Sequence, residues 1–427
     1  MLTDPGTIPA KRKAAWFGLY HKNRTQDELD QALTSLKDAG IEIIFLLVKV
    51  PWGGPDGNVY FNSSYVPMAP PYDWDCLAYV VEKAHEKGME VHPYLNILED
   101  GHFLYNHPEM AMVAENGENS TSWISPAYQA VRNHQINLMV EVVQKYDVDG
   151  IQMDRIRFLG TNYDYNPEMK RLYREKYMKE PSPWDPDWAQ FRKDIVSDLV
   201  REIYTQVKAV KPQVKFSAAV LPSPEAASMW ELQDWPTWVK NGWLDLVVTM
   251  AYTTSLSTLQ GLVTEEIQAV DCLASLYVGL GVYLLNPSEL QDQLNAVNIT
   301  GVDGVTFFSG TVLLDYPAYL DVIKNFNFGS LQITLGVLNT TIIMGENVTV
   351  SGSINSHLKG INVTFTYTRP NGSLVERTAL TNSCGISVDT YKPDAAGTWN
   401  VSASFTIKGV EIESQVIPFL VSGPLFT

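Results

Sequence analysis

The stretch Asp147–Phe158 reads DVDGIQMDRIRF. Its apolar residues are typical of a buried strand, yet the carboxylate of Asp154 stands near its end and two arginines follow. Side chains alternate between the two faces of a strand. Ile151 and Met153 therefore face one side. Gln152 and Asp154 face the other, so the pattern predicts a core strand whose carboxyl end carries a functional group.

Seven further apolar runs lie before residue 330, and amphipathic stretches follow most of them. In TQDELDQALTSLKDAG, for example, Leu29, Leu33 and Leu36 recur at helical spacing before Gly40. Eight strand and helix pairs predict an α/β fold, a closed (β/α)8 barrel rather than an open doubly wound sheet. No GxGxxG or P-loop pattern follows a strand, which argues against a nucleotide cofactor. The predicted strands are KAAWFGLY (13–20), IEIIFLLVK (41–49), MEVHPYLN (89–96), VDGIQMD (148–154), VKFSAAVL (214–221), LDLVVTMAY (244–252), SLYVGLGVYL (275–284) and VDGVTFFS (302–309).

From residue 331 onward, short alternating runs replace the helical periodicity. NVTVSGSI, GINVTFTYTR and GTWNVSASFTI are examples, and turn signals such as PNGS and DAAG separate the runs. This spacing predicts an antiparallel β-sandwich of the immunoglobulin-like type. We therefore predict two domains in the 427-residue chain, the barrel over residues 1–329 and the small all-β sandwich over residues 330–427.

Charge and cysteine content exclude several classes of partner. The chain carries 48 acidic and 31 basic side chains, a formal charge of −17 and a pI of about 4.8. Nucleic acids are bound by clustered Lys and Arg, so this balance argues against them. Cys76, Cys272 and Cys384 are too few and too widely spaced for a disulfide framework or a zinc site. His21 and His92 are too isolated to act as metal ligands, so we expect no metal and no cofactor.

The sequence also bears on the compartment. No apolar run approaches the roughly 20 residues of a membrane span, and the start, MLTDPGTIPAKRK, lacks the order of a signal peptide, so we expect a soluble chain. Nine Asn-x-Ser/Thr sequons are nevertheless present, five of them after residue 330. Such crowding predicts a glycosylated protein that is extracellular or on the cell surface. The alternative is that Asn and Thr simply suit the strands and turns of the tail. The sequons begin at Asn23, Asn62, Asn119, Asn298, Asn339, Asn347, Asn362, Asn371 and Asn400.

Several predicted strands end in polar or aromatic residues, at the face where barrel enzymes build their sites. Aromatic faces stack on sugars, amide and basic groups donate to hydroxyls, and a carboxylate supplies a nucleophile or stabilises an oxocarbenium-like transition state. Tyrosines also fill space at barrel rims, and a lone carboxylate often pairs with an arginine, so only the convergence of these groups indicates a sugar site. Besides the catalytic candidate Asp154, the candidate substrate-binding residues are Lys49, Trp52, Tyr94, Asn96, Gln152, Arg157, Tyr252 and Tyr283.

Glycoside hydrolysis normally needs a second carboxyl group, and its identity is open. The fifth predicted strand ends without an acid, but Glu225 and Asp234 follow on the next loop, which would neighbour Asp154 in a sequentially wound barrel. Asp234 is our first candidate, Glu225 the second and Glu99 the third, and Asp100 also qualifies. The alternative role for Asp234 is to cap the helix that follows it.

The segment WISPAYQAVRNHQINLMVEVVQKYDVDGIQMDRIRF resembles the hallmark segment of glycosyl hydrolase-like family 10, also called domain of unknown function 187. SAAVLPSPEAA, LQDWPTWVKNGWLDLVVTMAYT and GLGVYLLNPSELQDQL resemble later strand regions of the same family, so the likeness covers nearly all of residues 13–325. It implies a (β/α)8 glycoside hydrolase, distantly related to the α-amylase-like barrels in which a DGFRxD strand carries the nucleophile. DGIQMD matches that pattern at Asp149, Gly150 and Asp154, which implies the nucleophile role for Asp154.

The sequence departs from the family pattern at several positions. Gln152 stands where the arginine of DGFRxD would be, and we expect Arg157 to take over its role. Ser125 and Tyr128 stand where the family commonly has Asp and His, and Phe158 with the next residue replaces Tyr-Pro. The tail resembles the immunoglobulin-like repeats of archaeal surface proteins, which suggests cell-surface attachment through this domain.

Together these features predict a secreted glycoside hydrolase that cleaves O-glycosidic bonds in a polysaccharide or glycan. The competing hypothesis is a catalytically inactive glycan-binding or cell-surface structural protein, which the missing acid at the fifth strand favours. A metal-dependent polysaccharide deacetylase would need Asp and His ligands clustered at strand ends, a pattern that the sequence lacks.

Overall fold

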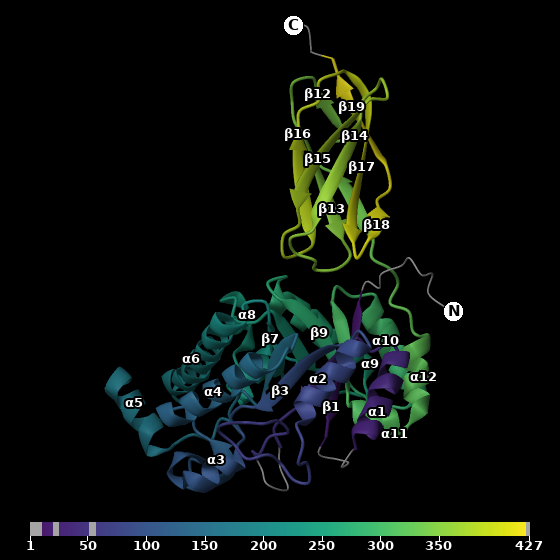
Figure 1. Ribbon diagram of the computed structural model, residues 1–427. Helices are drawn as coiled ribbons and strands as arrows, with labels where there is room; N and C mark the ends of the chain where they lie inside the picture. The colour runs from purple at the N-terminus through teal and green to yellow at the C-terminus, as the bar shows by residue number, and fades with distance from the viewer. Residues whose placement is uncertain (1–10, 20–24, 51–56, 424–427) are drawn as a thin grey trace. The chain divides into compact units, whose positions relative to one another are not determined.

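The computed structural model describes residues 11–19, 25–50 and 57–423. The described chain forms two compact units, one of Arg12–Phe326 and one that contains the residues from Asn327 onward together with Lys11. Figure 1 shows helices around strands in the first unit and strands alone in the second.

Eight parallel strands close the first unit into a barrel, in the order β1, β2, β3, β6, β7, β8, β9, β10 and back to β1. This confirms the fold class predicted from the alternating pattern. Each of the eight predicted stretches matches a barrel strand that is shorter than the stretch. Seven strands lie within their stretches, and β1 begins one residue earlier, at Arg12. The strands are β1 (Arg12–Gly18), β2 (Ile43–Leu47), β3 (Glu90–Asn96), β6 (Gly150–Asp154), β7 (Lys215–Val220), β8 (Leu246–Met250), β9 (Ser275–Gly281) and β10 (Gly304–Phe308).

Helices cover the outside of the barrel, and local sequence signals set their ends. In α1, Thr25 accepts a hydrogen bond from the Glu28 amide while the Glu28 side chain binds the Thr25 amide, a reciprocal cap that fixes the first turn. The longer helices are α1 (Gln26–Asp38), α2 (Cys76–Glu86), α4 (Gln129–Lys145), α5 (Pro167–Tyr177), α6 (Pro186–Val210), α9 (Leu256–Val270), α10 (Pro287–Asn298) and α12 (Pro317–Asn325).

Shorter elements follow some strands at their carboxyl ends, where a site would be built. A hairpin of β4 and β5, which the sequence did not predict, lies between β3 and α4. These elements are α3 (Gly101–Asn106), η1 (Pro108–Met110), β4 (Ala111–Val113), β5 (Asn119–Ile124), α7 (Pro224–Trp230), α8 (Trp235–Lys240), η2 (Val282–Leu284) and α11 (Gly310–Asp315).

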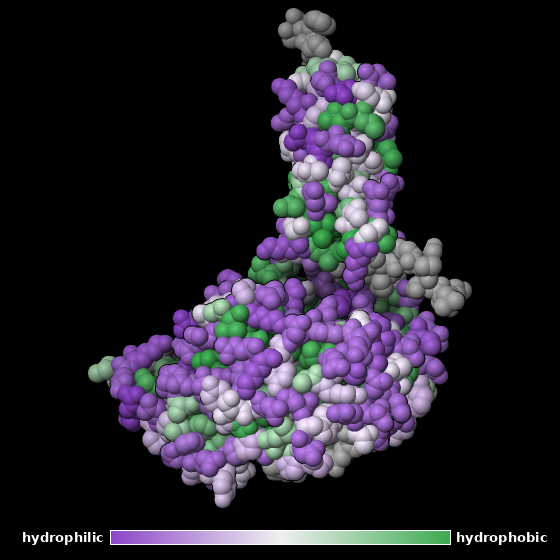
Figure 2. Space-filling view, in the orientation of Figure 1, coloured by the Kyte–Doolittle hydropathy of each residue, from purple (hydrophilic) through white to green (hydrophobic). Residues whose placement is uncertain are grey.

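The barrel interior is filled by every second residue of the strands, as the alternation requires. The face of the barrel unit visible in Figure 2 is mainly hydrophilic, with hydrophobic residues scattered singly or in small groups. The buried interior cluster consists of Ala14, Trp16, Ile43, Phe45, Leu47, Tyr94, Ala219, Leu246, Val248 and Tyr277.

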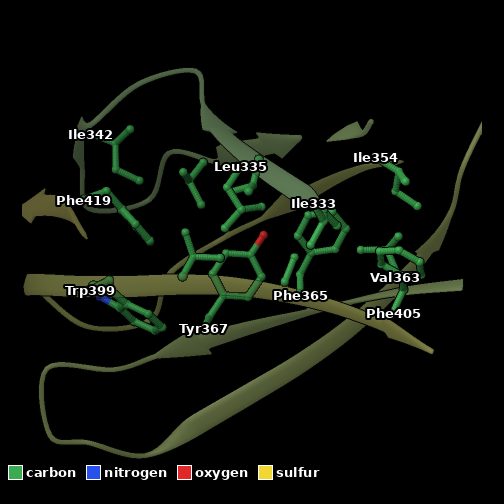
Figure 3. Packing of buried hydrophobic residues seen from close by; sticks show 14 of the residues in the cluster. Ile333, Leu335, Ile342, Ile354, Val363, Phe365, Tyr367, Trp399, Phe405 and Phe419 are labelled. Carbon is green, nitrogen blue, oxygen red and sulfur yellow. The ribbon is translucent and has the colours of Figure 1, made fainter. Parts of the chain in front are cut away.

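The second unit packs a sheet of three strands against a larger sheet around a core of aliphatic and aromatic side chains (Figure 3). Tyr367 of the larger sheet donates its hydroxyl hydrogen to Asp389 of the smaller one at 2.9 Å, so the two sheets are also joined by a buried polar contact. All pairs are antiparallel except β12 with β19. The strands are β11 (Ile333–Val337), β12 (Thr341–Ile343), β13 (Val348–Ile354), β14 (Asn362–Thr368), β15 (Leu374–Leu380), β16 (Ile386–Tyr391), β17 (Gly397–Ile407), β18 (Val410–Glu413) and β19 (Ile417–Ser422).

Candidate active site

A cavity of about 240 Å³ lies among side chains at the carboxyl ends of the barrel strands. Pockets that enclose drug-sized ligands measure roughly 300 to 1,000 Å³, so this cavity has room for one small ring rather than for a chain. Most of its wall is apolar or aromatic, and the polar groups come from β3, β6 and the residues directly after β6. The lining residues are Trp16, Leu47, Tyr94, Asn96, Asp154, Arg155, Arg157, Ala219, Met250, Tyr252 and Phe308.

Asp154, the last residue of β6, supplies the cavity's carboxylate. It is the only Asp or Glu that lines the cavity within the described part of the chain. One carboxylate oxygen accepts the Arg155 amide hydrogen at 2.7 Å, and the side chain is partly exposed. Asn96 of β3 lies directly opposite Asp154 in the strand register. A carboxylate and an amide thus share one wall of the cavity.

Gln152 lies two residues before Asp154 on the same face of β6 and is fully buried in the barrel interior. Its Oε1 accepts a hydrogen bond from Trp16 Nε1 at 2.8 Å, which ties β6 to β1 across the barrel. Its Nε2 has no hydrogen-bond partner among the described residues. Gln152 therefore supports Trp16, a residue of the cavity wall, and is not itself part of the lining.

Two arginines stand beside Asp154, and each is paired with a glutamate. Arg155 Nε lies 3.5 Å from Glu99 Oε2, and Arg157 Nη1 lies 2.6 Å from Glu231 Oε2. Both guanidinium groups approach the ring of Trp123, at 6.0 and 5.6 Å from its centroid. Pairing and cation–π contact hold the arginine side chains in place, so both arginines remain part of the cavity wall that also contains Asp154.

Aromatic rings form the opposite side of the cavity. Tyr252 stacks on Phe308 with centroids 5.4 Å apart, and Trp16 meets both rings edge-on at 6.3 and 6.0 Å. Tyr283, which is 52% exposed, contacts Tyr252 and Phe308 edge-on from outside the cavity. An apolar ring surface facing a carboxylate, an amide and two arginines suits a ligand with one apolar face and several hydroxyl groups.

The structure brings together in the cavity wall half of the eight residues that the sequence singled out for binding. Tyr94, Asn96, Arg157 and Tyr252 line the cavity with Asp154. Gln152 and Tyr283 contact lining residues without lining the cavity themselves. Trp52 lies outside the described residues.

Lys49 requires a correction. Its side chain is fully buried and does not line the cavity. Its Nζ is 2.7 Å from Asp100 Oδ2, and the two groups form an ion pair inside the protein. Burial tends to raise the pKa of Asp100, but the charges and hydrogen bonds of Lys49 and His134 together outweigh it, and the pKa lies well below the ordinary value. Lys49 is thus enclosed where a ligand in the cavity cannot reach it.

The carboxylates expected to assist Asp154 also lie elsewhere. Asp234 does not line the cavity and accepts a hydrogen bond from Thr237 Oγ1 at 2.8 Å at the start of α8. Glu225 is exposed in the first turn of α7. Asp100 is buried and caps α3 through the Phe103 amide. Glu99 does not line the cavity either, but its ion-pair partner Arg155 does.

Sequence reasoning missed Trp16, Phe308 and Glu231. Trp16 and Phe308 occupy inward positions of predicted strands, so the same alternation that selected Asp154 would have found them. Glu231 gave no such signal, because it lies in an irregular loop after α7 and its link to Arg157 arises only in three dimensions.

In the described ranges, no group of three or more His, Cys, Asp or Glu side chains is arranged to hold a metal ion. Nor does any helix there have the length and apolar character needed to cross a membrane.

Comparison with known proteins places this site in a family context. The model of the family named glycosyl hydrolase-like 10 matches residues 11–294. The glycosyl hydrolase YngK of Bacillus subtilis is 27% identical over 225 residues, which cover 47% of this chain and 40% of YngK. An S-layer-related protein of Niallia circulans is 21% identical over 486 aligned residues, covering 93% of this chain and 29% of that protein. The chain thus spans less than half the length of these curated relatives.

Among solved structures, the glycoside hydrolase domain of PgaB (BpsB) from Bordetella bronchiseptica superposes with a TM-score of 0.59 at 15% identity. The match covers 74% of this chain and all of that domain. At this level of identity the likeness concerns the fold alone.

Proposed function

The chain belongs to the glycosyl hydrolase-like 10 family, and from this premise we propose that it cleaves O-glycosidic bonds in a polysaccharide or glycan. One observation carries the proposal: among the described residues a single carboxylate, Asp154, stands at the carboxyl end of a barrel strand in a cavity that is otherwise lined by aromatic and aliphatic side chains, one amide and two arginines. Active sites of (β/α)8 enzymes lie at this face. One sugar ring fits the cavity, and the rest of the glycan extends outside it.

In the proposed reaction Asp154 acts on the anomeric carbon, either as nucleophile or as the charge that stabilises the oxocarbenium-like transition state. The Nδ2 of Asn96 has no hydrogen-bond partner within the described part of the chain, although the residue is only 1% exposed. A buried amide donor without a partner is costly, and a substrate oxygen in the cavity would satisfy it. Trp16, Tyr252 and Phe308 would cover the apolar face of the ring.

For the proton donor we propose Glu231 in place of Asp234. Glu231 follows the fifth barrel strand, β7, which is hydrogen-bonded to β6, and its partner Arg157 lines the cavity. Its side chain is 26% exposed, so solvent and substrate can reach it.

We further propose that the protein is exported and glycosylated, and that its second unit has an immunoglobulin-like fold that serves in cell-surface attachment. Within the described ranges the asparagines of the sequons are exposed or partly exposed, and none is buried. Glycosylation needs an accessible acceptor, which these asparagines provide. Peptide mapping of protein from its native host, with and without enzymatic release of N-glycans, tests this proposal.

A second candidate function is glycan binding without catalysis, in a cell-surface structural protein. The S-layer-related protein covers most of this chain, and no second carboxylate lines the cavity among the described residues. This candidate predicts that labelled glycans bind but remain intact.

The deciding experiment is a digestion screen of reducing-end-labelled polysaccharides, in which product release is measured for wild type and for Asp154→Asn. The substitution keeps the shape of the side chain and removes its charge, so we expect a loss of at least about 10³-fold in turnover. Asp147→Asn is the matched control, because Asp147 is an 89% exposed carboxylate at the other end of the same segment. Wild-type turnover in Asp154→Asn would exclude this residue from the mechanism. Binding without cleavage by the wild type would favour the second candidate.

A further inference from the structure

Lys49 and Asp100 form an ion pair that is completely enclosed, since both side chains have no exposed surface. Removing two charges from water costs several kcal/mol for each ion, and only good geometry with further hydrogen bonds offsets this. Such a pair is weak evidence for stability on its own. A gain in stability therefore does not explain why this ion pair is buried at this place in the fold.

The pair is fully satisfied by its surroundings. Lys49 Nζ donates to Asp100 Oδ2 at 2.7 Å, to the Asn96 carbonyl at 2.8 Å and to Gln135 Oε1 at 3.3 Å, which uses all three of its hydrogens. Asp100 also accepts from Gln135 Nε2, from His134 Nε2 and from the Phe103 amide. The ammonium group therefore has a fixed position and direction.

One of these bonds reaches the cavity. The carbonyl of Asn96 and the amide of Ile97 belong to the same planar peptide unit. Lys49 Nζ donates a hydrogen bond to the oxygen of this unit, and the Ile97 amide of the same unit donates to the Asp154 carbonyl at 2.9 Å. The side chains on either side of that hydrogen bond, those of Asn96 and Asp154, both line the cavity.

We propose that Lys49 and Asp100 are positioning residues, which fix the orientation of the Asn96–Ile97 peptide and thereby the placement of the Asn96 amide against the Asp154 carboxylate. The inference rests on the proposed function for its kinetic consequences, but its geometric content is independent of it. It also gives Lys49 a role other than the substrate contact expected from the sequence.

The test uses the double variant Lys49→Met/Asp100→Asn, which removes both charges and leaves no buried ion uncompensated. Asn at position 100 can still accept from the Phe103 amide and cap α3. The matched control is Arg132→Met/Glu202→Gln, which removes an ion pair of 2.6 Å between α4 and α6 that contacts no lining residue. If the double variant does not fold, Lys49→Arg takes its place, because a planar guanidinium cannot reproduce the three bonds of the ammonium group.

Two measurements are made on each folded variant. In crystal structures, we expect the distance from the Ile97 amide nitrogen to the Asp154 carbonyl oxygen to exceed 3.5 Å, or the Asn96 side chain to turn out of the cavity wall, with the barrel otherwise unchanged. On the fastest-cleaved polysaccharide of the screen, we expect kcat per folded molecule to fall about 100-fold, as for a misplacement of about 1 Å, with KM changed far less. The control pair is expected to keep wild-type kcat.

Unchanged positions of Asn96 and Asp154 in the variant would overturn the proposal, as would a kcat loss no larger than that of the control pair. A wild type that cleaves no polysaccharide would refute the proposed function, while the crystallographic comparison would still decide the positioning role.

Discussion

Glu266 provides a prediction in which the size of the effect follows from the structure. Its side chain lies fully buried on α9, and neither carboxylate oxygen has a hydrogen-bond partner of good geometry among the described residues. Burial raises the pKa of Glu266 to about 8. Nearby Thr249 opposes this rise, and the charge of Glu265 adds to it. The folded protein therefore keeps this carboxyl group protonated at neutral pH.

In the unfolded chain the Glu266 carboxyl has its ordinary pKa of 4.5. As the pH rises above 4.5, the unfolded state releases a proton that the folded state keeps, so the free energy of unfolding decreases until the pH passes 8. At about 1.36 kcal/mol per pH unit, the loss reaches roughly 3 kcal/mol at pH 7 and roughly 5 kcal/mol above pH 8. Glu266→Gln replaces the protonated form by a neutral group of the same shape and removes this loss.

We therefore expect Glu266→Gln to stabilise the barrel by less than about 1 kcal/mol at pH 5 and by about 3 kcal/mol at pH 7. Urea unfolding at pH 5, 7 and 8.5, followed by tryptophan fluorescence, measures this, because ten of the 11 tryptophans precede residue 327. Glu265→Gln, which changes the exposed neighbouring carboxylate, is the control and is expected to show no comparable gain. A stability difference independent of pH, or a Glu266→Gln variant less stable than wild type at pH 8.5, would refute the reasoning.

Two predictions concern the site. Glu231→Gln is expected to lower kcat at least about 10²-fold, as loss of a general acid does. The control Asp234→Asn loses only a local contact and is expected to keep wild-type kcat. Equal effects of the two substitutions in the polysaccharide assay would contradict the choice of Glu231 as the acid. Tyr252→Ala removes a stacking surface from the cavity, so we expect KM to rise about tenfold. Tyr65 is exposed and does not line the cavity, so the control Tyr65→Ala is expected to leave KM unchanged. An unchanged KM in Tyr252→Ala would argue against the sugar-stacking role.

The fold could be predicted because its signals are local and repeated. Apolar runs of strand length alternate with helical periodicity, and the same alternation within DGIQMD assigns Asp154 to the barrel interior. Asp154 needs no long-range information to be placed, since its position in the strand and the polarity of its neighbours decide it. Tyr94, Asn96 and Tyr252 followed from the same reasoning, because each stands within two residues of a strand end.

What the sequence by itself determined is thus the barrel, the all-β second unit and the strand that carries the cavity's carboxylate, all of which depend on the period of hydrophobic residues along the chain. Only the tertiary structure decided the partners of the charged groups. Lys49 and Asp234 are of residue types that are common in sugar-binding sites. Lys49 is nevertheless enclosed with Asp100, and Asp234 contacts its own helix. Glu231 reaches Arg157 across 74 residues of sequence. Such pairings depend on how loops of different strands meet at the mouth of the barrel, and hydrophobic periodicity carries no information about that.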